Sequence, residues 1–133
     1  MNYWLVKSEP FKYAWEQFEK DGRTSWDGVR NYQARNNLQA MQTGDLVLYY
    51  HSNEGKAVIG VAKVVREADP TANSPAWVVV DLVPEQKLDR PVTLEQIKAD
   101  ERLHQMGLIR QSRLSVMPVT AAEFDIIIAL GSV

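Results

Sequence analysis

Two apolar runs separated by a short polar loop constrain the fold of this chain more than any other feature. Leu46–His51 and Ala57–Val65 are rich in β-branched and aromatic residues, which is typical of strands. Ser52–Gly55 joins them, and such a loop between two strand-like runs indicates a hairpin. We therefore expect the longest strand pair of the fold to be antiparallel.

The remaining pattern mixes short strands with helices. Further strands are predicted at Tyr3–Lys7, Ala76–Val83 and Arg113–Val119. Apolar spacing and capping signals predict helices at Phe11–Lys20, Gln33–Met41, Pro91–Gln105 (with Thr93 as N-cap) and Glu123–Leu130 (after a Thr120–Glu123 capping box). Polar connections are expected at Thr24–Tyr32, Asp69–Pro75 and Val80–Lys87. This alternation favours the α+β class, with a small barrel of about five or six strands and helices on its outside.

The size and composition indicate one soluble domain. A chain of 133 residues has the length of a single domain, so residues 1–133 are expected to form one unit. It has no cysteine, which excludes disulfides, thiol nucleophiles and thiolate metal sites. No apolar run approaches the roughly 18–20 residues that span a bilayer, and no signal-peptide pattern is visible. We therefore expect a cytoplasmic protein without a membrane partner, and as a hypothesis a monomer.

The charge balance limits how nucleic acid could be bound. The chain has 15 basic and 17 acidic residues, a formal net charge of −2. A protein that binds mainly by neutralising phosphates is expected to be strongly basic. A local basic rim around one pocket is still compatible with this composition, because binding follows the local field.

No catalytic or metal-binding motif is present in the sequence. The two histidines, His51 and His104, are isolated from each other and have no neighbours at metal-ligand spacing. His51 and Ser52 are adjacent, but no G-x-S-x-G elbow or glycine-rich phosphate loop accompanies them. We therefore predict no catalytic residue, no metal and no cofactor.

The aromatic residues are concentrated in the first part of the chain. Ten of the twelve Trp, Tyr and Phe residues lie within the first fifty positions, which hints at a pocket there. The segment from Ser25 to Asn36 combines Trp26, carboxamides and two arginines, a set that can stack on a base and read its edge. Each residue also has a structural interpretation: Trp26 as a core ring, Asn31 as a helix N-cap, and the arginines as solvated surface charges.

The order of several short motifs resembles a known family. These are YWLVKSEP at 3–10, WDGVRNYQARN at 26–36, Gly44-Asp45, Tyr50-His51-Ser52, RPVTL at 90–94 and RLSVMPV at 113–119. Together they resemble the EVE domain, the thymocyte nuclear protein family, over essentially the whole chain.

The resemblance implies a PUA-like fold, which is related to that of YTH domains. It also implies a protein that binds modified bases, which for EVE domains are modified cytosines in DNA. Carried over by position, the resemblance implies a base-binding pocket lined by Lys7, Ser8, Trp26, Asn31, His51, Ser52, Arg113, Leu114 and Ser115. Trp26 would be the stacking wall, and Ser8 and Asn31 would read the edge of the base. Possible phosphate contacts at the rim are Arg30, Arg35 and Arg110.

Two departures from the family pattern bear on ligand choice. Members often carry Asp-Glu after Glu9-Pro10, whereas this chain has Phe11-Lys12-Tyr13. The loop Asp69–Pro75 is short where many relatives have a long acidic, proline-rich insertion.

The leading hypothesis is a non-enzymatic module that binds DNA or RNA, or a free modified nucleotide, through one flipped and modified base. Two alternatives remain open. The first is an enzyme acting on a nucleotide, or a nuclease-associated subunit that needs a catalytic partner. The second is a protein-interaction domain, which would present an exposed apolar patch around Trp26.

Overall fold

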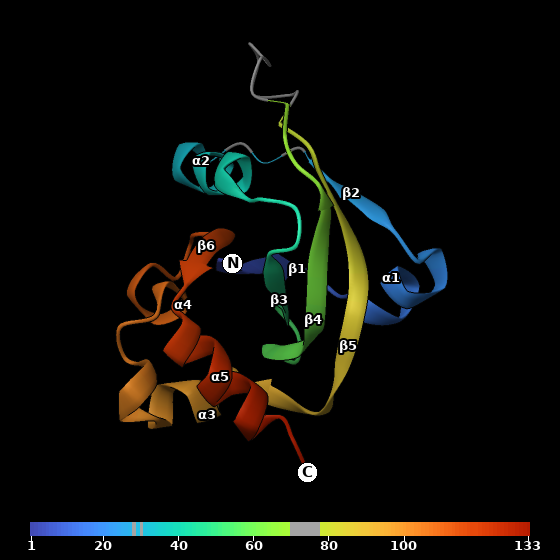
Figure 1. The fold of residues 1–133 in the computed structure, drawn as a ribbon. Coiled ribbons are helices and arrows are strands. Elements are labelled where there is room, and N and C mark those ends of the chain that lie inside the picture. Colours follow the sequence, from blue (N-terminus) through green and yellow to red (C-terminus); the bar gives the residue numbers. More distant parts are fainter. Residues whose placement is uncertain (28, 30, 70–77) are drawn as a thin grey trace.

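Six strands of the described residues form one curled, mixed sheet (Figure 1). The computed structural model describes residues 1–27, 29, 31–69 and 78–133. The strands are β1 (Tyr3–Ser8), β2 (Thr24–Trp26), β3 (Leu46–His51), β4 (Ala57–Arg66), β5 (Val80–Thr93) and β6 (Val116–Val119). Their order is β2-β5-β4-β3-β1-β6; β1 and β3 are parallel, and all other neighbours are antiparallel. The α+β class with a small curled sheet is thereby confirmed.

The predicted hairpin is the pair β3–β4. Leu46 is opposite Lys63 and His51 is opposite Ala57, so the first run pairs along its whole length, with a register shift between Tyr49 and Tyr50. The connecting loop turns at Asn53 and Gly55, which both have a positive φ of 68° and 69°. Asparagine and glycine adopt that conformation at low steric cost, which explains a turn at this position.

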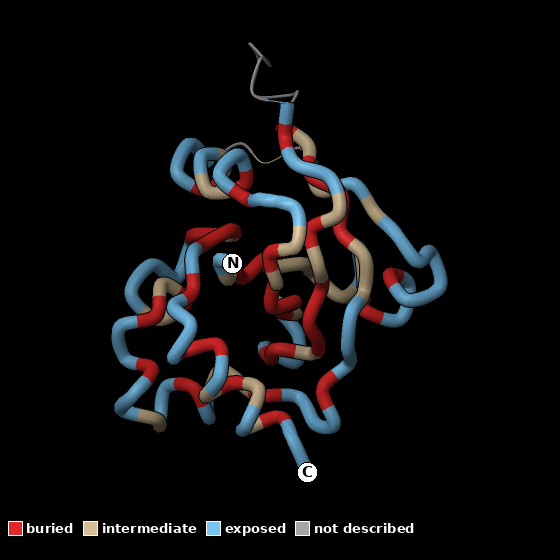
Figure 2. The backbone as a smooth tube through the Cα atoms, in the orientation of Figure 1, coloured by how far each residue is buried: buried red, intermediate tan, exposed pale blue. Residues whose placement is uncertain are grey.

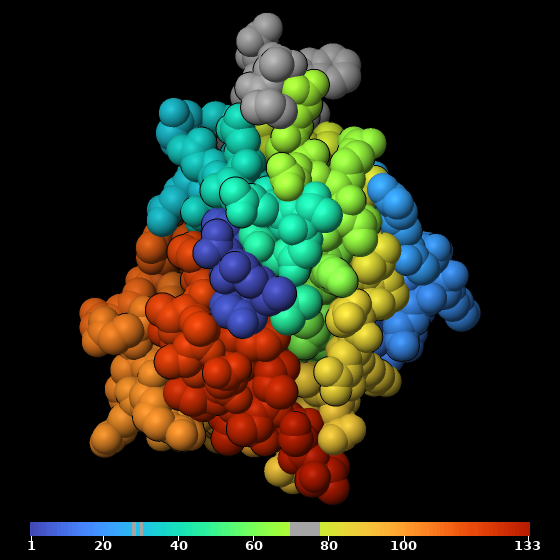
Figure 3. Space-filling model, viewed as in Figure 1, coloured from blue at the N-terminus to red at the C-terminus, as the bar shows by residue number. Residues whose placement is uncertain are grey.

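Helices lie on both sides of the long strands. They are α1 (Trp15–Asp21), α2 (Tyr32–Ala40), α3 (Leu94–Ala99), the 3-10 turn η2 (Glu101–Leu103), α4 (Gly107–Arg110) and α5 (Ala121–Leu130). In Figure 1, α1 lies on one side of β4 and β5, and the other helices lie on the opposite side. On the face shown in Figure 3, the first residues of the chain lie against α5, where the rings of Tyr3 and Phe124 are 4.4 Å apart. Among the described residues, no helix is long and apolar enough to cross a membrane.

The core lies between the sheet and these helices (Figure 2). Its three largest fully buried side chains among the described residues are aromatic: Trp15 and Phe18 of α1 pack against Tyr49 of β3, with ring centroids 5.3–5.4 Å apart. Trp15 reaches this position because Gly60 of β4 has no side chain. A Cβ at Gly60 would lie 2.6 Å from Cη2 of Trp15 and 2.9 Å from the carbonyl oxygen of Gln86.

Three predicted boundaries were wrong for reasons of local hydrogen bonding or strand pairing. The first helix begins at Trp15 and not at Phe11, because the backbone N–H groups of Lys12 and Tyr13 both donate to the Glu9 carbonyl and form a turn. The predicted connection from Thr24 contains strand β2, which pairs with β5. The last predicted strand begins at Val116, not at Arg113.

The largest correction concerns β5. The predicted strand Ala76–Val83 is confirmed at residues 80–83. The polar connection expected over Val80–Lys87 and the helix expected from Pro91 are wrong there, because the strand continues to Thr93 by pairing with β4. The helical stretch then breaks into α3, η2 and α4. The predicted loop Asp69–Pro75, apart from Asp69, and the first two residues of the predicted strand Ala76–Val83 lie outside the described residues.

The predicted caps are confirmed. The Thr93 side chain accepts from the backbone N–H of Gln96 at 3.1 Å, and Thr120 accepts from that of Glu123 at the same distance. In both cases the side chain three residues later also accepts from the backbone N–H of the threonine, completing a capping box.

Candidate functional site

A surface cavity of about 510 Å³ lies where β1, β2 and β3 end close to the segment that precedes β6. Its volume is in the range of small-molecule sites. It is lined by Lys7, Ser8, Glu9, Lys12, Trp26, Asp27, Val29, Ser52, Ser112, Arg113 and Ser115. Six of the nine residues expected to line a base pocket are therefore neighbours here, although they come from four separate stretches of the chain.

The parallel pairing of β1 with β3 brings the first of these stretches together. Ser8 is the register partner of His51, so both strands end at the same edge of the sheet. The backbone N–H of Ser52 donates to the Ser8 carbonyl at 2.9 Å, which continues the pairing one step further. The hydroxyl of Ser8 donates to the carbonyl of Tyr13 at 2.8 Å and thereby holds the turn after β1 against the cavity.

Trp26 forms the aromatic wall of the cavity. It ends the edge strand β2, and its ring is half-buried, meeting Tyr49 edge-on at 5.7 Å and 82°. Tyr49 is fully buried, and burial raises its pKa to about 12, so the phenol is neutral and donates to the carbonyl of Tyr13 at 2.7 Å. One part of the ring thus packs on the core, as the structural interpretation predicts, and the rest borders the cavity, where the functional interpretation requires it.

Lys7 connects β1 to the segment that carries Arg113. Its ammonium donates to the carbonyl of Ser112 at 2.8 Å, and its backbone N–H donates to the carbonyl of Ser115 at 3.0 Å. Burial lowers the pKa of Lys7 below its ordinary value. Lys7 therefore fixes the opposite wall of the cavity while placing a positive charge beside it.

The rim carries charges of both signs. Lys12 lies 3.3 Å from a carboxylate oxygen of Glu9, whose other oxygen accepts from the Asn53 side chain at 2.8 Å. Arg113 is exposed and has no ion-pair partner among the described residues. The rim can therefore offer one unengaged guanidinium to a phosphate, alongside the exposed carboxylate of Asp27.

The structure does not bring the other three expected pocket residues to this cavity. Asn31 caps α2, since its side-chain oxygen accepts from the backbone N–H of Ala34 at 2.9 Å. His51 accepts with Nε2 from the backbone N–H of Trp15 at 3.1 Å, and its ring lies 5.9 Å from that of Tyr49. Leu114 is buried and faces a second cavity.

The expected rim arginines lie elsewhere or outside the described residues. Arg35 stacks on the ring of Tyr32 at 4.9 Å, and Arg110 lines the second cavity. Arg30 lies outside the described residues.

Five lining residues were not predicted: Glu9, Lys12, Asp27, Val29 and Ser112. Each lies within a few positions of a residue that was predicted, so the motifs lie in the segments that line this cavity. Which side chain of a segment faces the cavity depends on turns and strand ends that the motifs do not encode.

The chemistry of this arrangement is that of binding. The cavity offers a flat ring, serine hydroxyls, and cations at its wall and rim. Within the ranges that the structure describes, no group of three or more His, Cys, Asp or Glu residues is placed to hold a metal ion.

The curled mixed sheet with flanking helices, open at one edge into an aromatic-walled cavity, places the protein in the PUA-like class. A YTH domain from Zygosaccharomyces rouxii, in complex with N6-methyladenosine RNA, superposes with a TM-score of 0.64 at 14% identity. The alignment covers 99% of this chain and 87% of that one, so the two share a fold.

The family follows from sequence as well as fold. The family model of the EVE domain matches residues 2–130, and this chain belongs to the EVE domain family. It is 35% identical over 165 residues to mouse thymocyte nuclear protein 1, covering 97% of this chain and 73% of that protein. The human THYN1 protein, in complex with 5-methylcytosine-containing DNA, superposes with a TM-score of 0.89 at 32% identity, covering 98% of each chain.

Proposed function

We propose that this protein binds nucleic acid by taking one flipped, methylated cytosine-type base into the cavity beside Trp26. The observation that carries the proposal is the aromatic wall of this cavity in a chain whose 32% identical structural relative is in complex with 5-methylcytosine-containing DNA. The protein acts in this role as a monomer in the cytoplasm, and it catalyses no reaction on the base.

The contacts around the cavity support this role in detail. A flipped base loses its stacking and pairing at a cost of a few kcal/mol. Stacking on Trp26 would stabilise the bound base by about 1–3 kcal/mol and so offset much of this cost. Hydroxyls of Ser52 and Ser115 and the ammonium of Lys7 are close enough to the cavity to meet polar edges of the base.

The methyl group itself contributes less than the ring. Burial of one methyl-sized group stabilises a complex by about 0.8 kcal/mol, which corresponds to about a fourfold preference. Among the described residues that line the cavity, Val29 is the apolar aliphatic one, so we assign the methyl contact to it.

The test is an anisotropy titration of fluorescein-labelled short single strands that differ in one central base. The strands carry cytosine, 5-methylcytosine, 5-hydroxymethylcytosine, adenine or N6-methyladenine. We expect the 5-methylcytosine strand to bind several-fold more tightly than the cytosine strand. Replacing Trp26 by alanine should weaken that binding about 5- to 150-fold, and Trp26→Phe should recover part of it.

Tyr32→Ala is the matched control. Tyr32 is an exposed ring on α2 that does not line the cavity, so its removal should leave the affinity unchanged. Equal affinity for all five strands would overturn the base-reader proposal, as would binding that is unaffected by Trp26→Ala. Conversion of the modified base during incubation, detected by nucleoside chromatography, would instead favour the enzyme alternative.

A further inference from the structure

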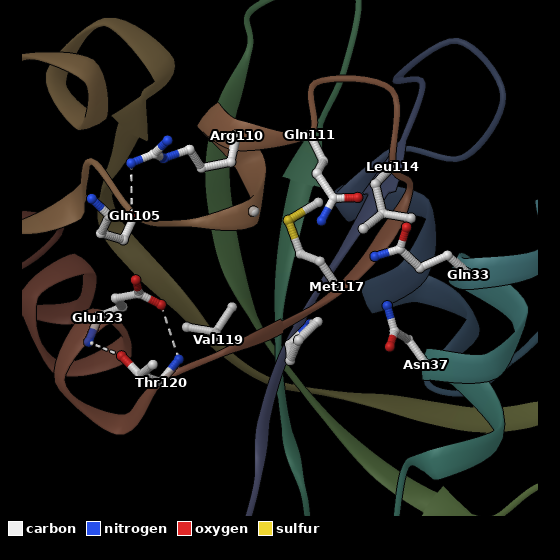
Figure 4. Close-up of a pocket in the computed structure, with 12 residues that line it drawn as sticks. Gln33, Asn37, Gln105, Arg110, Gln111, Leu114, Met117, Val119, Thr120 and Glu123 are labelled. Carbon is white, nitrogen blue, oxygen red and sulfur yellow. Dashed lines mark hydrogen bonds between the residues drawn. The ribbon is translucent and has the colours of Figure 1, made fainter.

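A second cavity, of about 430 Å³, lies between α2, α4, β6 and the start of α5 (Figure 4). Most of the polar side chains that line it are carboxamides, and they lie over an apolar floor. Gln33 and Asn37 project from α2, and Gln111 projects from the segment that follows α4 (Figure 4). Leu114 and Met117 form the floor between them.

The carboxamides of this cavity are largely unengaged. The side chains of Gln33 and Gln111 have no hydrogen-bond partner among the described residues. The Asn37 side chain donates to the carbonyl of Val116 at 2.8 Å, and no described residue donates to its oxygen. The cavity therefore presents amide donors and amide acceptors side by side.

The two charged residues of the cavity are already engaged. Arg110 donates to the carbonyl of His104 at 3.2 Å and to the side-chain oxygen of Gln105 at 2.8 Å. Glu123 is buried and accepts from the backbone N–H of Thr120 at 3.0 Å. Arg110 keeps its positive charge in these bonds, but Glu123 in the same lining carries the opposite formal charge. The described lining therefore has no net formal charge, which favours an uncharged polar molecule over a phosphate.

A nucleobase matches this combination of groups. Glutamine and asparagine carboxamides pair with the donor–acceptor edge of adenine, its N6 and N7. Leu114 gives the cavity an apolar surface that suits the face of a flat ring, whereas Met117 in the same lining is fully buried.

The second cavity shares a wall with the first. Ser112, Arg113 and Ser115 line the cavity beside Trp26, whereas Gln111, Leu114 and Met117 line this one. Gln111 and Ser112 are consecutive, so their Cα atoms are about 3.8 Å apart. Hydrogen bonds hold the wall on both sides, from Lys7 to Ser112 and from Asn37 to Val116.

We propose that the cavity between Gln33 and Gln111 is a second nucleobase site, which takes an unpaired adenine adjacent in the strand to the flipped base. The strand context of this site rests on the proposed function of the first cavity. Its adenine chemistry rests on the free carboxamides alone and can be tested separately.

The separate test is a titration of ¹⁵N-labelled protein with free adenosine, followed through the side-chain amide signals of Gln33, Gln111 and Asn37. We expect these signals to shift with adenosine and to respond less to uridine. The double variant Gln33→Ala/Gln111→Ala should abolish the response of the remaining Asn37 signal. The control Gln39→Ala removes a carboxamide from the same helix that does not line the cavity, and it should leave the response intact. Adenosine shifts that are absent, or that persist in the double variant, would overturn the site.

Strand binding then separates this proposal from the first one. The strands carry 5-methylcytosine with either adenine or an abasic position next to it. We expect the adenine strand to bind at least about fivefold more tightly, and the double variant to remove that difference. Strand binding that depends on Trp26 but not on the neighbouring base would overturn the proposed adenine site and leave the proposed base site beside Trp26 intact. If no strand binds while adenosine still shifts the glutamine signals, the proposed function fails and the adenine site stands.

Discussion

At the scale of single residues, His51 shapes the cavity through the backbone. Its Nε2 accepts a hydrogen bond from the backbone N–H of Trp15, the first residue of α1. This contact ties the end of β3 to the turn that carries Glu9 and Lys12, both of which line the cavity. Only a neutral imidazole can accept this bond, and burial lowers the pKa of His51 although nearby Glu16 raises it.

The stability of the protein should therefore fall below neutral pH. Because the folded-state pKa of His51 is below the ordinary value of about 6.5, the unfolded chain binds the proton more readily. The contribution of this histidine is fully present above pH 6.5, and it is lost as the pH falls through 6.5 toward the folded-state value. Urea unfolding at pH 7.5 and pH 5.5 should show this loss, and His51→Gln, which keeps a neutral acceptor, should reduce it.

His104→Gln is the control for the other histidine. His104 is exposed, and its ring nitrogen meets the carbonyl of Lys98 at 2.9 Å, away from the cavity. Substitution there leaves the hydrogen bond between His51 and Trp15 in place, so the loss of stability that His51 causes at pH 5.5 should persist in His104→Gln. The assignment of this loss of stability to His51 would be contradicted if the loss disappeared in His104→Gln, or if it were as large in His51→Gln as in the unsubstituted protein.

At the scale of elements, β4 and α1 pack closely because Gly60 leaves room for Trp15. A Cβ added at Gly60 would meet both a ring atom of Trp15 and the rigid backbone oxygen of Gln86. Gly60→Ala should therefore lower the free energy of unfolding by about 2 kcal/mol, measured by urea denaturation. Gly107→Ala should lower the free energy of unfolding less than Gly60→Ala does, since its Cβ would lie 3.3 Å from the flexible Met117 sulfur. Equal losses in the two variants would argue against close packing at Gly60.

Elements with local signals could be predicted from the sequence, and β5 could not. The capping boxes at Thr93 and Thr120 depend on residues three positions apart, so the pattern contains the whole interaction. The second half of β5 is polar and mostly exposed, and it is a strand because β4 pairs with it. Pro84 fits in this strand because its register with β4 shifts beside Ala62, and a bulge tolerates the missing donor.

In the candidate site, the sequence predicted which segments line the cavity but not which side chains of each segment face it. The motifs located Lys7-Ser8, Trp26, Ser52 and residues 113–115, which the cavity brings together apart from Leu114. Leu114 lies between Arg113 and Ser115 in sequence but faces the other cavity, because the short segment before β6 directs neighbouring side chains to opposite sides. The direction of such side chains follows from tertiary hydrogen bonds, such as that of Lys7 to Ser112, which no short pattern contains.

At the scale of the whole molecule, electrostatics should contribute little to nucleic-acid binding. The net charge is −2, and the cations at the cavity are Lys7, Lys12 and Arg113, of which Lys12 is paired with Glu9. Neutralising two or three phosphates of a single strand gives a slope between about −1.4 and −2.1 for log K against log salt. Anisotropy titrations between 50 and 300 mM NaCl should yield a slope in this range. A slope of −5 or steeper would instead indicate an extended basic surface.

The position of β1 in the sheet has a consequence for how the protein folds during synthesis. β1 pairs with β3, about forty residues later, and with β6, more than one hundred residues later. The cavity wall beside Lys7 comes from that same distant region. Contacts of such long sequence separation close slowly, because the entropy of a large loop is lost before they form. The hairpin β3–β4 can form early on the ribosome, whereas the wall of the cavity beside Trp26 is completed only after residue 115 has emerged.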